Sequence, residues 1–120
     1  MSGNSVRLAF AALAVLLLGA GCGDQLREAA RERQCRANLN TLSTDQAMFR
    51  NNHGRWATTV EDLDQLAGRT LPLMCPSSME PYRLALAGDD YLLQCPAGKH
   101  GSIQTGTPSW APPAPVRRST

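Results

Sequence analysis

The hydrophobic and polar positions of this chain change character several times between its two ends. An unbroken apolar run covers residues 8–18, and a polar stretch rich in good helix formers follows from residue 24. Apolar side chains then return at helical spacing, with one glutamine in the same row: Cys35, Leu39, Leu42, Gln46 and Phe49. This period of 3.6 predicts a helix over residues 24–51, with an exposed first half and a second half packed on a core.

A second helix and a hairpin are predicted farther along the chain. Thr59 is a suitable N-cap, Val60 and Leu63 begin an apolar face, and Gly68 is a stop signal, which together predict a helix over residues 60–67. Two short stretches of alternating character flank a Gly/Asp turn and predict a β-hairpin over residues 82–94. The expected fold class is therefore α+β, with a long N-terminal helix packed on a small antiparallel sheet.

The composition changes again near the C-terminus. From residue 104 the chain consists mainly of Pro, Ser, Thr and Ala, with Trp110 as a lone aromatic and a basic end at Arg117 and Arg118. Such a segment buries too little apolar surface to fold by itself. We predict a domain over residues 22–103 and a disordered tail over residues 104–120, in which Trp110 stays solvated.

The first residues have the three zones of an export signal. Arg7 lies in a short polar start, the apolar run covers residues 8–18, and the small residues Gly19, Ala20 and Gly21 follow. The apolar run is shorter than the roughly 20 residues that span a bilayer. This pattern predicts a signal peptide over residues 1–21.

Cys22 directly follows these small residues, and the arrangement resembles the lipobox of bacterial lipoproteins, although that family favours Leu where this chain has Gly19. The resemblance implies that Cys22 carries a diacylglycerol, with a palmitate-like chain on the new N-terminus. Several acyl chains anchor a protein stably, whereas one does not. The protein is then expected in the cell envelope, on the inner or outer membrane, facing the periplasm. The alternative is ordinary cleavage that leaves Cys22 as a plain thiol.

Charge and candidate chemistry narrow the function classes. The formal net charge is only +2, and the early arginines alternate with Asp24, Glu28 and Glu32, which indicates a solvated helix face rather than a basic patch for nucleic acid. No nucleophile, base and acid occur in a recognisable catalytic order. We therefore expect neither an enzyme nor a cofactor or small-molecule substrate.

The order of several motifs resembles type IV pilins and type II secretion pseudopilins. They are Cys35-Arg36-Ala37-Asn38-Leu39, then Phe49, Gly54-Arg55-Trp56, Cys75-Pro76, Cys95-Pro96 and His100-Gly101. The resemblance implies a pilin-like head with a structural or binding role and a protein partner in a secretion or pilus assembly. The apolar run lacks the length and the Glu of a pilin filament core. An envelope lipoprotein unrelated to secretion is the alternative.

The remaining cysteines favour a disulfide. Cys75 and Cys95 each precede a proline and flank the predicted hairpin. In an oxidising compartment they are the natural disulfide, worth about 3 kcal/mol in the chain-entropy account. Cys35 is then expected to be a small buried hydrophobe. Pairing of Cys35 with either cysteine stays open, because the sequence does not determine connectivity.

A zinc site is the other possibility for these residues. Cys75, Cys95 and His100, together with Cys35 or His53, offer four ligands. Structural zinc sites usually contain paired ligands two to four residues apart, and this chain has no Cys-x-x-Cys. The sequence thus favours a disulfide and no metal, with a zinc-stabilised binding module as the alternative.

Overall fold

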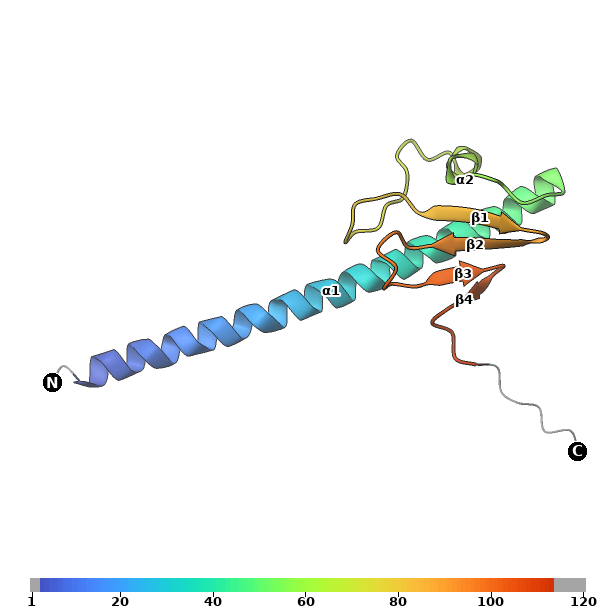
Figure 1. Ribbon diagram of the computed structural model, residues 1–120. Coiled ribbons are helices and arrows are strands. Elements are labelled where there is room, and N and C mark those ends of the chain that lie inside the picture. Colours follow the sequence, from blue (N-terminus) through green and yellow to red (C-terminus); the bar gives the residue numbers. More distant parts are fainter. Residues whose placement is uncertain (1–2, 114–120) are drawn as a thin grey trace, which may run out of the picture.

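The computed structural model describes the backbone of residues 3–113 and the side chains of residues 23–113. Helix α1, Gly3–His53, contains 51 residues and is roughly 75 Å long at 1.5 Å per residue. Figure 1 shows its first half projecting as a stalk, while the rest of the chain forms a head on its second half. Among the described residues, none of the helices combines the length and apolar character needed to cross a bilayer.

The predicted first helix is confirmed over residues 24–51, and α1 extends beyond both predicted ends, to Gly3 and His53. It ends where Gly54 adopts a φ of 73° and donates its N–H to the Arg50 carbonyl at 2.8 Å. The predicted signal peptide, residues 1–21, and the side chain of Cys22 fall outside the described side chains. Lipid on Cys22 therefore stays a prediction.

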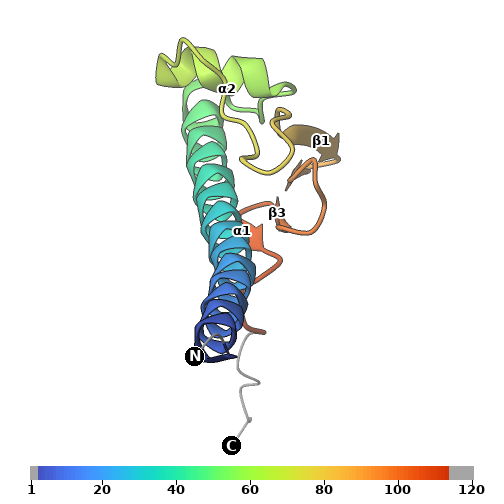
Figure 2. The ribbon, with the colours of Figure 1, turned by 90° about the vertical axis from the view of Figure 1, so that its left-hand side faces the viewer.

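Helix α2, Val60–Ala67, has the predicted bounds. Thr59 accepts the N–H of Asp62 at 3.2 Å, and Gly68 ends the helix in the left-handed region with a φ of 70°. Figure 2 shows α2 lying across the C-terminal end of α1. Val60 and Leu63 point into the core, as expected from their spacing.

A four-stranded antiparallel sheet with the order β1-β2-β3-β4 completes the head. Its strands are β1, Arg83–Ala87; β2, Asp90–Gln94; β3, Ser102–Gln104; and β4, Thr107–Pro108. The first two strands confirm the predicted hairpin, with Gly88 and Asp89 as its turn. The α+β fold class is thus observed.

The expected disordered tail is wrong for its first part. Residue 104 ends β3, and β4 pairs back on it through Ile103↔Pro108. Trp110 is not solvated but packs partly buried against the core, with the Arg36 guanidinium 5.0 Å from its ring centroid. Tertiary contacts thus order a segment whose composition alone would not, while residues 114–120 lie outside the described part.

The core lies between α1 and one face of the sheet. Along β2 and just beyond it, Tyr91, Leu93 and Cys95 alternate inward, and Ile103 of β3 pairs with Leu93. The helical row predicted from spacing faces them and is buried throughout: Cys35, Leu39, Leu42, Gln46 and Phe49. The stalk side of this core is where the cysteines meet.

Candidate metal centre

Four buried side chains with metal-binding atoms meet at the stalk end of the head. Cys35 lies on α1, Cys75 in the loop after α2, Cys95 directly after β2, and His100 in the loop before β3. Their exposed fractions are 0, 0, 3 and 1%. All four ligand atoms lie within 4.8 Å of one another. The fold therefore assembles three thiols and one imidazole that lie far apart in the sequence.

The spacing of these atoms matches a tetrahedral zinc site. Cys95 Sγ lies 3.3 Å from Cys35 Sγ and 3.5 Å from Cys75 Sγ. His100 Nδ1 lies 3.6 Å from the sulfurs of both Cys75 and Cys95. Zinc bonds of about 2.3 Å to sulfur and about 2.0 Å to nitrogen give tetrahedron edges of about 3.8 Å and 3.5 Å. The four shortest distances lie within about 0.5 Å of these edges, and all the ligand atoms lie within 4.8 Å of one another, so a zinc ion fits among them after a modest contraction of the cluster.

The predicted Cys75–Cys95 disulfide is not present in the structure. Its two sulfurs are 3.5 Å apart, far beyond the bond length of about 2.05 Å. Cys35, Cys75 and Cys95 are all free thiols. Cys35, expected only as a small buried hydrophobe, belongs to the cluster, with its sulfur 3.3 Å from that of Cys95. The expectation failed because it treated the hairpin cysteines as an isolated pair.

A tight turn favours the thiolate form of Cys75. The Cys75 N–H donates to the Glu80 carbonyl at 3.0 Å, and the Met79 N–H returns to the Cys75 carbonyl at 2.8 Å. Burial raises the pKa of the Cys75 thiol, but the backbone N–H groups of Ser78 and Ser77 in this turn outweigh it and lower that pKa to about 6. The thiolate is the form that binds metal.

A second turn carries Cys95 and His100. The Gly98 N–H donates to the Cys95 carbonyl at 3.0 Å, and the Cys95 N–H donates to the Gly101 carbonyl at 3.1 Å. Gly101 has a φ of 107°, and a Cβ there would lie 2.9 Å from the Trp110 ring. Backbone contacts thus close the loop and hold the imidazole over the sulfurs.

Cys35 has a different environment. Burial, the largest influence, raises its pKa to about 12, although a hydrogen bond from Tyr82 acts in the opposite direction. Tyr82 Oη lies 3.2 Å from Cys35 Sγ and accepts a hydrogen bond from Asn38 Nδ2 at 3.2 Å. Without a cation nearby, Cys35 is therefore a protonated thiol, and it needs a metal to become a thiolate.

Two groups beyond the four ligands were missed from the sequence. Glu28 was assigned to a solvated helix face, but its Oε1 lies 2.9 Å from His100 Nε2. Hydrogen bonds from His100 and Lys99 lower the pKa of Glu28 to about 2. Tyr82 was expected only as a strand residue. The other sequence candidate, His53, is exposed and stacks on Phe49 with ring centroids 4.2 Å apart, away from the cluster.

The arrangement suits a structural metal better than catalysis. A nucleophilic cysteine needs a low pKa and access for its substrate. Cys75 has the first property but is fully buried. Three sulfurs and one nitrogen already supply the four ligands of a closed structural zinc site, so no position remains for a substrate or water.

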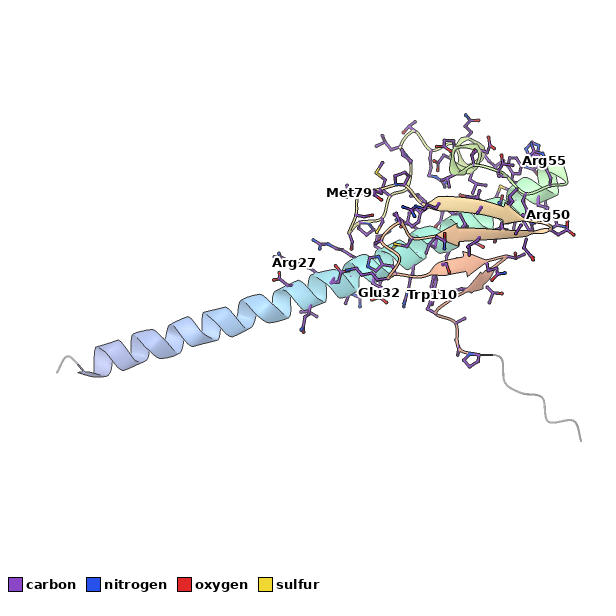
Figure 3. The ribbon with its side chains drawn as sticks, in the orientation of Figure 1. Arg27, Glu32, Arg50, Arg55, Met79 and Trp110 are labelled. Atoms are coloured by element: carbon purple, nitrogen blue, oxygen red, sulfur yellow. The ribbon has the colours of Figure 1, made fainter. Side chains whose placement is uncertain are left out.

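The charged groups around the site occur as ion pairs. Three thiolates and a neutral imidazole would leave a zinc ion with a net charge of about −1, and the nearby cations Arg36 and Lys99 each pair with a carboxylate of α1. Arg36 Nε donates to the His100 carbonyl at 3.1 Å, and Figure 3 shows Glu32, which ion-pairs with Arg36, on the same end of the head as Trp110.

A scan against protein-family models, a search of curated proteins and a search of solved structures find no match to this chain, and the resemblance to pilins and lipoproteins stays a prediction.

Proposed function

We propose that this protein is a zinc-stabilised structural or binding head, carried on a helical stalk and held to an envelope membrane by lipid on Cys22. The single observation that carries the metal part is the buried tetrad of three sulfurs and one imidazole nitrogen within 4.8 Å of one another. Zinc is the metal that such a set of soft ligands with tetrahedral spacing favours.

The role of the ion is to fold the head. Its four ligands come from α1, the loop after α2, the end of β2 and the loop before β3, so one ion joins segments that lie far apart in the sequence. Structural zinc supplies an apparent free energy of about 10–16 kcal/mol. That is comparable to the whole stability of a typical domain, about 5–15 kcal/mol. The zinc-free head is therefore expected to lose its fixed tertiary structure.

The anchor part of the proposal depends on the sequence. The apolar run over residues 8–18 and the small residues before Cys22 support export and lipidation. Cleavage before Cys22 leaves only the short part of α1 ahead of Glu28 to link the lipid to the head, and the head is then expected to meet a protein partner. The order of pilin-like motifs supports a partner in a secretion or pilus assembly, and this step depends on analogy alone.

Zinc content and thiol count test the metal proposal. The full-length protein is purified from membranes in detergent with no added metal, and zinc is measured by mass spectrometry beside a thiol titration. The expected result is one zinc per chain, with Cys35, Cys75 and Cys95 reacting only after a chelator removes it. A metal-free protein with a Cys75–Cys95 disulfide would overturn the proposal and restore the interpretation made from the sequence.

Intact mass tests the anchor separately. A mass that begins at Cys22 and includes diacylglycerol and one further acyl chain supports lipidation, and the Cys22→Ser variant serves as control. A chain that retains residues 1–21 contradicts lipidation. The continuity of α1 from Gly3 to His53 would then favour a helix-anchored, pseudopilin-like protein.

A further inference from the structure

The stalk touches the metal cluster through a single buried nitrogen. Glu28 Oε1 lies 2.9 Å from Nε2 of His100, whose other ring nitrogen, Nδ1, faces the sulfurs of Cys75 and Cys95 at 3.6 Å. The imidazole is thus held between a carboxylate on one side and the cluster on the other.

A carboxylate in this position selects the tautomer of the ring. A neutral imidazole carries its proton on one nitrogen and its lone pair on the other. Because Glu28 accepts the proton on Nε2, the lone pair stays on Nδ1, directed at the cluster. Metal-bound histidines commonly donate their second N–H to a carboxylate in this way.

Glu28 is itself fixed by groups beside the ligands. Lys99 Nζ lies 2.9 Å from Oε1, and the Ser77 hydroxyl lies 3.4 Å from the same oxygen. Lys99 precedes His100, and Ser77 belongs to the turn after Cys75. The carboxylate therefore joins both ligand-bearing loops to α1, two helical turns before Cys35.

An ordinary surface ion pair does not account for these contacts. Arg31, one turn along α1, lies 3.7 Å from Glu28 Oε2 with half of its side chain exposed, and such a pair adds little stability. The His100 side chain is only 2% exposed, and its Nε2–H donates to the Glu28 carboxylate. A hydrogen bond to a charged acceptor contributes more than an exposed ion pair.

We infer that Glu28 is a positioning residue of the metal centre, which orients His100 for coordination through Nδ1 and lets the bound metal lock the stalk onto the head. This inference rests on the proposed zinc site. It adds a specific atom for the bond to the metal and a mechanical consequence, because the head holds Glu28 through His100, Lys99 and Ser77, all of which lie on the loops that carry the ligands.

Zinc affinity of matched variants tests the inference. Glu28→Ala and Glu28→Gln are compared with Asp24→Ala, which removes an exposed carboxylate of the same helix one turn earlier. Affinity is measured on the full-length protein in detergent by competition with a chromophoric chelator. We expect a loss of about 10–100-fold for Glu28→Ala, a smaller loss for Glu28→Gln, which keeps an acceptor, and no change for Asp24→Ala.

Nitrogen NMR of His100 supplies a readout that a merely structural role would not move. In the zinc-bound native protein, Nδ1 is expected to carry the metal and Nε2 the proton, with a slowly exchanging N–H. In zinc-bound Glu28→Ala, that proton is expected to exchange rapidly. Amide hydrogen exchange over residues 24–34 should rise on chelation of the native protein, and it should already be raised in the zinc-bound variant.

The outcomes separate this inference from the proposed function. If the native protein binds no zinc, the proposed metal centre fails and the inference fails with it. If the native protein binds one zinc but Glu28→Ala binds it equally well, or if His100 coordinates through Nε2, the positioning role is wrong while the metal centre stands.

Discussion

Gln46 and Ala57 form a closed pair of hydrogen bonds inside the head. Gln46 Nε2 donates to the Ala57 carbonyl at 3.1 Å, and the Ala57 N–H donates to Gln46 Oε1 at 2.8 Å. Both residues are fully buried. A side-chain amide on α1 thus replaces the backbone partner that a strand would have supplied, and it fixes the loop between the two helices.

Replacing Gln46 by Ala should therefore destabilise the zinc-bound head by about 2–4 kcal/mol, because two buried backbone groups lose their partners. Chemical denaturation with zinc present measures the change. Gln65→Ala, an exposed position on α2 with the same change of side chain, is the control and should have little effect. Equal effects of the two substitutions would show that the paired amide is not important for stability.

The hydroxyl of Tyr82 should strengthen metal binding. It donates to Cys35 Sγ at 3.2 Å, and groups that hydrogen-bond to metal ligands typically contribute 10-fold or more in affinity. Tyr82→Phe is expected to weaken zinc binding by about 10-fold, as measured by chelator competition. Tyr91→Phe removes a buried hydroxyl that bonds only to Ser43, at 2.6 Å, and should leave zinc affinity unchanged. An equal loss in both variants would mean that general packing is responsible.

Replacement of Gly101 by a residue with a side chain should destabilise the head. Its φ of 107° disfavours L residues, and a Cβ would lie 2.6 Å from Ser109 Oγ and 2.9 Å from the Trp110 ring. Gly101→Ala is expected to lower the free energy of unfolding by more than about 2 kcal/mol and to displace Trp110, which fluorescence detects. Gly98, with a φ of 78° and open space around it, isolates the backbone cost, about 1 kcal/mol on replacement by Ala. Similar losses at both positions would contradict the steric argument.

We expect Arg69 to stabilise the head by compensating the charges of two nearly buried carboxylates. It bonds Asp45 of α1 at 2.7 Å and Asp64 of α2 at 2.8 Å, and the three side chains are at most 18% exposed. Arg69→Leu leaves two charges nearly buried without a partner and should cost about 3 kcal/mol at neutral pH.

This deficit should shrink as the pH is lowered, because protonation removes the uncompensated negative charges in the folded variant. Denaturation of the native protein and the variant across the acid range measures it, and Asp45→Asn combined with Arg69→Leu should recover part of the loss. A deficit that does not change with pH would indicate lost packing rather than unpaired charge.

The helices were predictable because their signals are local. Thr59 and Gly68 bound α2 through contacts within a few residues, and the row from Cys35 to Phe49 reflects the period of the helix itself. Strand β3 was missed because three residues are too few to show an alternating pattern, and β4 was missed because it lies in the segment predicted to be disordered. Their pairing is supplied by β2 and by the packing of Trp110.

The metal cluster could be predicted only in part. The sequence offered Cys75, Cys95 and His100 as a possible ligand set but favoured a disulfide. The usual sequence signature of a zinc site is a pair of ligands two to four residues apart, and this chain has no Cys-x-x-Cys. The stalk carboxylate Glu28 gave no signal at all, since it lies among alternating charges and its partner is 72 positions away.

Local signals in the sequence are sufficient for the long helix, the short capped helix, the first hairpin and the apolar row that packs on the core. The meeting of three cysteines with His100, and the contact of Glu28 with the imidazole, arise from the packing of the fold. Helix periods and caps are properties of neighbouring residues, whereas a ligand set drawn from separate segments exists only once the sheet has packed on the helix.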